Sequence, residues 1–244
     1  MSNKINVLDH GYVILRNISG PTRRSDAEFD ADDVDPANVA RKSFDQLDSN
    51  RPRDMELRLN DYLMRNWHTT PIEMIEIWLE MKMPIVAARQ LVRHRTAAID
   101  EVSARYVQLP AEWYIPKLED VVIQTKDKKQ GGRLIDLNNP VEVGQAQWFI
   151  EELNKQCGDS YKKYNIAIKY GMAMEQARLF LHVNHYTHWV WKQDLHNMMS
   201  LLARRDHSHA QRESQHYAQA IDTLLRKQVP NLMSLYDKYR RFDN

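Results

Sequence analysis

One short segment of the chain gathers the groups best suited to bind an anion. Its cationic side chains are Arg93, His94, Arg95 and Arg105, with Gln90 before them and Ser103 among them. Guanidinium groups pair with phosphate and carboxylate oxygens through two parallel hydrogen bonds and stay charged at any working pH. On a helix Gln90 and Arg93 would share a face, and in an extended segment Ser103 and Arg105 would point the same way. The segment therefore predicts a cradle for an anionic ligand.

A plainer interpretation of the same residues stays open. Asp100 and Glu101 lie inside the segment, so the cations could form a solvated basic turn that is paired with these two carboxylates. Exposed ion pairs of this kind are common and contribute little to stability. Composition by itself favours this solvated basic turn over an anion cradle.

Charge and composition exclude several classes of function. Lys and Arg number 34 against 33 Asp and Glu, a formal net charge of +1, so a nucleic-acid partner held by counterion release is not expected. The seven glycines form no Gly-x-Gly-x-x-Gly or Walker loop, so a bound nucleotide would need side-chain cations for its phosphates. No apolar run reaches the roughly 18 residues of a membrane span, and no secretory signal is visible. We therefore expect a cytoplasmic protein without a membrane partner.

The elements that would position the anion cradle mix strands with helices. Strands are expected at 4–17 (a pair of strands around residues 9–11), 73–83 and 185–192. Helices are expected at 35–46 (with Asp35 as N-cap and Pro36 first in the helix), 53–67, 84–93, 141–171, 173–182 and 194–240, the last with a break near Pro230. Between them we expect loops at 19–36 and 118–140, a break at Thr70–Pro71 and irregular structure over 94–117. This pattern predicts an α+β fold with a mixed or antiparallel sheet flanked by helices and a long helical C-terminal half.

The arginine segment also resembles a known family. Arg93-His94-Arg95, seven further residues and then Ser103 is similar to the signature of flavin-dependent thymidylate synthases. Further segments resemble that family in the same order: 40–44, 62–73, Arg105 with Tyr106, 114–116, Arg178 before the strand at 186–187, and Arg205 with 208–211. The resemblance covers most of the chain and leaves out mainly the polar insertions near 19–35 and 118–140. It implies that family's fold in a single domain over 1–244.

The resemblance implies an activity and its partners. A homotetramer would build FAD sites from several subunits and would methylate deoxyuridine monophosphate (dUMP) reductively at uracil C5. Methylenetetrahydrofolate would supply the carbon, and NADPH would reduce the flavin. The positions that match the family's dUMP site are Gln90, Arg93, Glu101, Val102, Ser103, Ala104, Arg105, Arg178 and Arg205. Those that match its FAD site are Thr70, Glu73, Arg93, His94, Arg95, Asp194, His196, Ser200 and His209.

Elementary chemistry is consistent with the implied roles. Uracil C5 becomes nucleophilic when negative charge is stabilised along the N3, O2 and O4 edge, and Arg205 would supply that stabilisation as the catalytic residue. The flavin carries the redox step, so no cysteine nucleophile is needed. Cys157 has no histidine partner in its sequence neighbourhood, so we expect it to be structural. Ser103 has no adjacent base, so we expect it to hydrogen-bond a ligand and not to attack one.

Three histidines and two groups of large side chains have structural interpretations. His182, His185 and His188 share one face neither on a helix nor on a strand, and no carboxylate lies among them, so we expect a structural or flavin-neighbouring role and predict no metal site. Trp189 with Trp191 and the methionines at 81, 83, 198 and 199 are expected in the core or at a subunit interface.

A few positions depart from the family pattern. They are Ala98, Asp100, His182, Asp194, His196, Ser200 and the pair Ala203–Arg204. None removes an arginine of the expected site. They leave two alternatives open: a related C5-alkylating enzyme for another pyrimidine nucleotide, such as a UMP methylase or hydroxymethylase, or a non-catalytic nucleotide-binding scaffold.

Overall fold

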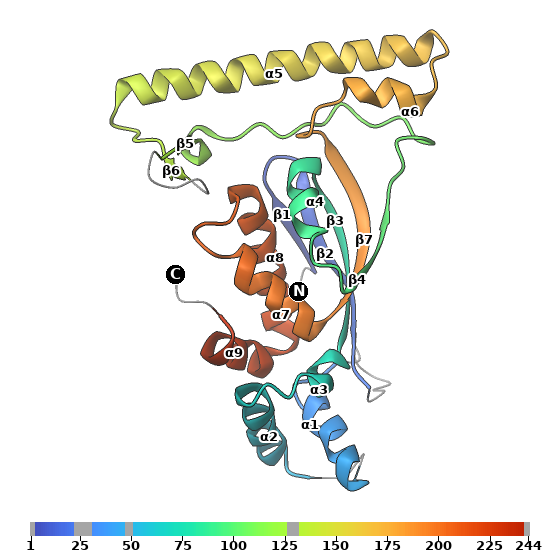
Figure 1. Cartoon of the computed structure of the whole chain (residues 1–244), viewed down its shortest axis with the longest axis vertical. Helices are drawn as coiled ribbons and strands as arrows, with labels where there is room; N and C mark the ends of the chain where they lie inside the picture. Colours follow the sequence, from blue (N-terminus) through green and yellow to red (C-terminus); the bar gives the residue numbers. More distant parts are fainter. Residues whose placement is uncertain (1–2, 22–30, 47–50, 126–131, 242–244) are drawn as a thin grey trace.

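The computed structural model describes residues 3–21, 31–46, 51–125 and 132–241. The chain is elongated, with a sheet and the helices that pack on it in the middle, a long helix at one end and a small helical group at the other (Figure 1). No helix among the described residues is long and apolar enough to cross a membrane.

A five-stranded sheet forms the centre of the molecule, in the order β1-β2-β3-β7-β4, and each neighbouring pair is antiparallel. Its strands are β1 (Lys4–Val7), β2 (Gly11–Ser19), β3 (Glu76–Pro84), β7 (Tyr186–Asp194) and β4 (Ala97–Glu101). Side chains alternate between the two faces of a strand, and the alternate residues Ile77, Leu79, Met81 and Met83 of β3 are fully buried. The expected α+β class with an antiparallel sheet is confirmed.

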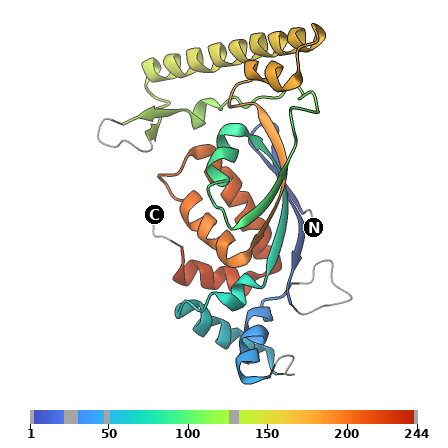
Figure 2. The same ribbon diagram turned by 45° about the vertical axis from the view of Figure 1, so that its right-hand side comes forward.

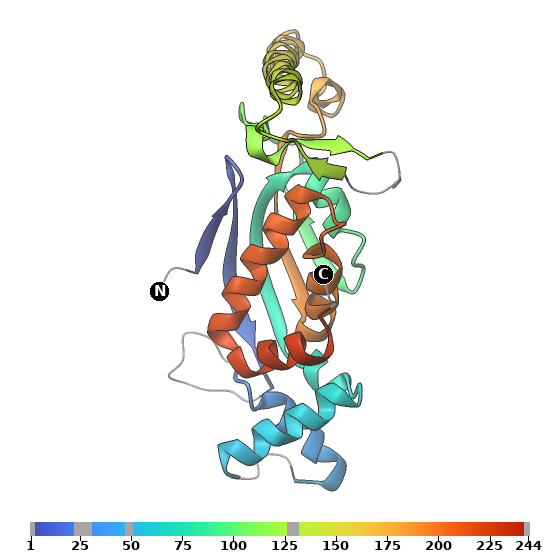
Figure 3. The same cartoon turned by 90° about the vertical axis from the view of Figure 1, so that its left-hand side faces the viewer.

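Three helices from the C-terminal part of the chain cover one face of this sheet, as the turned views show (Figures 2 and 3). They are α7 (Leu195–Arg205), α8 (Arg212–Gln228) and α9 (Pro230–Tyr239). The carboxylate of Asp194 caps α7 by accepting a hydrogen bond from the backbone N–H of Asn197, 2.9 Å away. Trp189, Trp191 and the four methionines named above are buried in the core between sheet and helices, which confirms their expected core role.

Smaller elements occupy the two ends of the molecule. Helix α4 (Ile85–Leu91), between β3 and β4, does not lie at an end but packs against α8, β3 and β7. The elements at one end are α1 (Asp35–Ala40), a 3₁₀ turn (Arg41–Phe44), α2 (Arg53–Arg65) and α3 (Thr70–Glu73). Those at the far end are a 3₁₀ turn (Leu118–Asp120), the hairpin of β5 (Val122–Gln124) and β6 (Gly132–Leu134), α5 (Pro140–Lys169), α6 (Met174–Ala177) and a 3₁₀ turn (Arg178–Phe180). The α5 helix is capped by Asn139, whose side-chain oxygen accepts from the Val141 N–H at 3.1 Å. Of its thirty residues only Ala146, Cys157 and Tyr164 are buried.

The structure corrects the expectation that 94–117 is irregular. Strand β4 occupies Ala97–Glu101 and pairs with β7 along its whole length. Its sequence, Ala-Ala-Ile-Asp-Glu, carries no apolar alternation because an edge strand is half exposed. The pairing joins segments almost a hundred residues apart, so local pattern could not reveal it.

Several helix boundaries also differ from expectation. The helix expected at 35–46 is α-helical only to Ala40, with Val34 as N-cap, and Thr70–Pro71 begins α3 instead of breaking the chain. The helix expected at 173–182 shortens to α6 and a 3₁₀ turn, and 194–240 has a second break at 206–211. The polar insertion at 118–140 contains the β5–β6 hairpin. Residues 22–30 and 126–131 of the two expected loops lie outside the described residues.

The turn between β1 and β2 is fixed against α8 by a close approach. A Cβ atom at Gly11 would overlap the hydroxyl oxygen of Tyr217 and would lie 2.7 Å from the Val7 carbonyl oxygen. That tyrosine hydroxyl donates to the carbonyl oxygen of Lys82 at 2.7 Å. Only a residue without a side chain leaves room for this hydrogen bond.

Candidate active site

The C-terminal end of α7 places Arg205 in a polar cavity of about 850 Å³. Its Nε donates to Nε2 of His94 and its Nη1 donates to Oε1 of Gln90, each at 3.1 Å. The cavity wall also includes residues 208–213, among them His209. A guanidinium has five N–H hydrogens, so three of the five remain without a partner among the described residues. Two protein groups thus hold the Arg205 cation in position, and its three other N–H donors remain available to a ligand.

The electrostatics of this cavity keep the Arg205 guanidinium charged and the His94 imidazole neutral. Burial, followed by the charges of Arg205 and Arg204, lowers the pKa of His94 to about 4. The ring is therefore neutral at physiological pH, and its Nε2 is the acceptor for Arg205, which leaves the proton on Nδ1. Burial and the neighbouring arginines also lower the pKa of Arg205, but a guanidinium stays charged.

A second, smaller pocket of about 290 Å³ collects most of the expected nucleotide residues. Its wall includes Glu101, Val102, Ser103, Ala104, Arg178 and Thr187. The Thr187 hydroxyl donates to Oε1 of Glu101 and fixes that carboxylate. Ser103 lies just past the end of β4, in a turn where its Oγ accepts from the Arg105 N–H at 3.3 Å. Ser103 and Arg105 therefore do not lie in the extended geometry in which they would point the same way.

The remaining arginines of the segment are exposed. Arg105 forms an ion pair with Glu175 at 3.1 Å. Arg93 and Arg95 make no hydrogen bond or ion pair with another residue in the described part of the chain. The alternative of a basic turn paired with Asp100 and Glu101 does not occur. Because α4 ends at Leu91, Arg93 also does not share a helical face with Gln90 as expected.

The other expected flavin residues lie at the opposite end of β3 and β7. Thr70 and Glu73 belong to α3. Asp194 ends β7 and caps α7, and His196 and Ser200 lie in α7, which packs against α3. The backbone N–H of Leu195, at the start of α7, donates to the carbonyl of Ile75, which lies between α3 and β3, at 2.8 Å. Both carboxylate oxygens of Asp194 are occupied by Asn197.

Within one chain the expected site residues thus form three separate groups. The cavity at Arg205 and the pocket at Ser103 have no lining residue in common. Sequence reasoning missed Thr187, Gln211 and Gln215, which line these two cavities or hold their walls. Thr187 faces Glu101 only because β7 pairs with β4, so no local signal could have identified it.

The side chains with structural interpretations lie outside these cavities. Cys157 is buried against the Asn184 amide, and burial raises the pKa of its thiol, which agrees with a structural role. His182 hydrogen-bonds Ser160 at 2.9 Å, and His188 hydrogen-bonds Glu80 at 2.9 Å, while His185 stacks on Tyr161. No group of three or more metal-binding side chains converges among the described residues.

Comparisons with known proteins show which sequences this chain is similar to. The family model described as thymidylate synthase complementing protein matches residues 27–231. A flavin-dependent thymidylate synthase from Ehrlichia ruminantium (strain Gardel) is 36% identical over 233 residues, which cover 96% of this chain and 72% of that one. The enzyme of that name from Gluconobacter oxydans (strain 621H) is 35% identical over 237 residues, with the same two coverages.

A solved structure shows the same fold. The UMP/dUMP methylase PolB from Streptomyces cacaoi, bound with 5-Br dUMP, has a TM-score of 0.82 at 24% identity and covers 98% of this chain and all of that chain. A family match over most of the chain, together with relatives above one-third identity, shows that this chain belongs to the flavin-dependent thymidylate synthases, a family of enzymes.

Proposed function

We propose that this enzyme methylates dUMP at uracil C5, with FAD as cofactor, methylenetetrahydrofolate as carbon donor and NADPH as reductant. The observation that carries the proposal is Arg205, which His94 and Gln90 hold in place while three of its N–H donors stay available. Negative charge that develops on the uracil edge would be stabilised by these donors. A preorganised cation of this kind needs no rearrangement during the reaction.

The chain offers a donor set that suits a flavin nucleotide. Arg93 and Arg95 are exposed cations without carboxylate partners in the described part of the chain, and guanidinium groups bind phosphate oxygens through paired hydrogen bonds, so they suit the diphosphate of FAD. His94 and His209, beside the Arg205 cavity, would contact the ring system. Thr70, Glu73, Asp194, His196 and Ser200 would hold the rest of the cofactor. When bound, the flavin supplies the hydride that completes the methyl group.

For the nucleotide we propose the pocket at the end of β4. The groups that would bind dUMP there are Ser103, Arg178 and the backbone of 102–104. Arg105 would join them if its ion pair with Glu175 were replaced by one with the phosphate of dUMP. Glu101 is held by Thr187 and offers a carboxylate to a sugar hydroxyl. Gln90, Arg93 and Arg205 would meet the base.

This division between separate cavities supports assembly from several copies. Arg205 and Arg178 can contact one nucleotide only if the two cavities come from different chains. Large apolar side chains at the far end of the molecule are exposed in the single chain, including Trp148 (66%) and Leu179 (81%), and such surfaces mark protein interfaces. We therefore propose a homotetramer of one-domain subunits, 1–244, in the cytoplasm.

The assay is a product analysis by mass. Purified enzyme with bound flavin is mixed with dUMP, methylenetetrahydrofolate and NADPH, and UMP replaces dUMP in a parallel reaction. We expect dUMP to gain the mass of one CH₂ unit. Gain of CH₂O would indicate hydroxymethylation, and faster turnover of UMP would indicate a UMP methylase, the alternative that the departures at 98, 100 and 200 leave open. No product from either nucleotide would refute the proposal.

A further inference from the structure

The loop between α7 and α8 determines where two expected site residues lie. Residues 206–211 follow Arg205 directly and carry His209, and their side chains form much of the wall of the 850 Å³ cavity. Within the loop the backbone makes two hydrogen bonds, from the Ala210 N–H to the His207 carbonyl at 2.8 Å and from the His209 N–H to Nδ1 of His207 at 3.2 Å. A loop with so few internal contacts depends on its neighbours for its shape.

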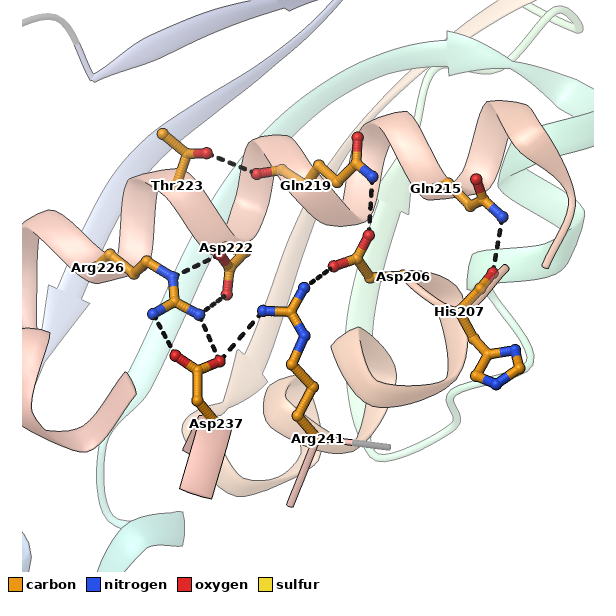
Figure 4. Close-up of polar contacts among 9 residues, drawn as sticks. All are labelled: Asp206, His207, Gln215, Gln219, Asp222, Thr223, Arg226, Asp237 and Arg241. Carbon is orange, nitrogen blue, oxygen red and sulfur yellow. Dashed lines mark hydrogen bonds and ion pairs between the residues drawn. The ribbon is translucent and has the colours of Figure 1, made fainter. Parts of the chain in front are cut away.

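One buried amide supplies the missing contacts. Nε2 of Gln215, in the first turn of α8, donates to the carbonyl oxygen of His207 at 2.7 Å and to that of Ala210 at 3.0 Å. The other side of this amide accepts from Arg212 at 3.4 Å. Gln215 is only 8% exposed, so the amide is shielded from water. Both ends of the His207–Ala210 turn are thus attached to α8 through a single side chain, and Figure 4 shows the contact with His207.

A second contact attaches the start of the loop to the C-terminal helix. The carboxylate of Asp206 accepts from Gln219 at 2.9 Å and also from Arg241. Arg241 in turn contacts Asp237 at 3.1 Å, and Asp237 pairs with Arg226 (Figure 4). This network ties the loop to α8 and α9.

We propose that Gln215 is a positioning residue of the active site, which acts by holding the 206–211 loop so that Arg205 and His209 face the cavity. The inference rests on the proposed function of Arg205. Gln215 itself does not bind the uracil. Loss of its two donors would free the loop and leave Arg205 attached through His94 and Gln90 alone. The pocket of Ser103 and Arg178 shares no residue with this loop, so the contacts proposed there for dUMP would persist.

The test replaces Gln215 by Met, which has the same length but no donor. A misplacement of about 1 Å can lower a rate by about 10²-fold, so we expect kcat to fall by about 10- to 100-fold, while KM for dUMP changes by less than about threefold. Amide hydrogens of 207–211 should exchange with solvent about tenfold faster. Gln228→Met, in the last turn of the same helix, is the matched control and should leave all three quantities unchanged.

A second variant keeps the test decisive if Gln215→Met folds poorly. Arg241→Gln cuts the contact to Asp206 near the end of the chain and should lower kcat several-fold, again with little change in KM. A Gln215→Met enzyme with normal flavin content and kcat within twofold of wild type would overturn the inference, as would unchanged hydrogen exchange in the loop. If the wild-type enzyme does not methylate dUMP, the proposed function fails, whereas hydrogen exchange still reports on the loop.

Discussion

Replacement of Arg205 by Lys is the sharpest test of the site. In the structure the arginine makes two hydrogen bonds to protein groups at 3.1 Å and keeps three donors in the same plane for a ligand. Lysine keeps the positive charge, but its three N–H donors diverge from one nitrogen, so it cannot reproduce the planar fork whose separate nitrogens face His94, Gln90 and the uracil edge. The charge is conserved and the geometry is lost.

The expected size of the effect follows from that geometry. Loss of one preorganised donor to a developing anion costs about 10²- to 10³-fold in kcat, or about 2.7–4 kcal/mol. We therefore expect Arg205→Lys to keep less than about 1% of wild-type turnover, while the protein retains its oligomeric state and part of its FAD. Because Nε of Arg205 also holds the neutral ring of His94, some loss of flavin affinity should accompany the loss of rate.

The assay compares single-turnover product formation by mass in wild type, Arg205→Lys and Arg204→Lys. Arg204 is the matched control because it precedes Arg205 on α7, is exposed, and makes no hydrogen bond or ion pair with another described residue. Arg204→Lys should stay within threefold of wild type. If the Arg205→Lys enzyme binds flavin and also turns over within threefold of wild type, Arg205 does not stabilise the reacting uracil.

Three further outcomes are expected. Cys157→Ser should keep wild-type turnover because the thiol is buried away from both cavities; a folded, flavin-bound but inactive variant would require a cysteine-based mechanism. Ser200→Asn should tighten FAD binding about two- to tenfold, the value of one hydrogen bond, without changing the nucleotide used; an FAD titration of apo-protein measures this, and equal or weaker binding contradicts it. Burial lowers the pKa of the His185 imidazole from 6.5 to about 4. As the pH falls, this imidazole is therefore protonated in the unfolded chain before it is protonated in the native protein, so the free energy of unfolding decreases between pH 6.5 and 4. Between pH 7.5 and pH 5, the free energy of unfolding in urea should therefore fall by about 2 kcal/mol less in His185→Phe than in wild type. An equal fall in the two proteins would contradict the low pKa of His185.

Local pattern was enough to predict much of the fold. The hairpin at the N-terminus, the strands near 73–83 and 185–192, and the helices near 53–67 and 141–171 all carry their own periodicity, and each is found within a few residues of its expected place. Strand β4 was missed because its stability comes from pairing with β7 and from no pattern of its own. The break at 206–211 was missed because the loop is held by the side chain of Gln215. This residue lies in a helix, and nothing in the local sequence indicates that its side chain contacts the loop.

The site was less accessible to sequence reasoning than the fold. Matching positions to a family pattern picked out Arg205, Gln90 and His94, and the structure brings these three into contact. The same matching assigned Arg178 and Arg205 to one ligand, although within one chain they line different cavities. Residue types also do not tell that His94 is neutral, since its low pKa arises from burial beside arginines far away in sequence.

The close approach of Gly11 to Tyr217 has a consequence for how this sequence can change over time. A side chain at position 11 and a tyrosine hydroxyl at position 217 compete for the same volume, because a Cβ at position 11 would also lie 2.8 Å from the Lys82 carbonyl that the hydroxyl binds. A side chain at position 11 needs both the loss of the hydroxyl at position 217 and a shift of the Val7 and Lys82 carbonyls. Relatives with tyrosine at position 217 should therefore keep glycine at position 11, although the two positions lie 206 apart in numbering.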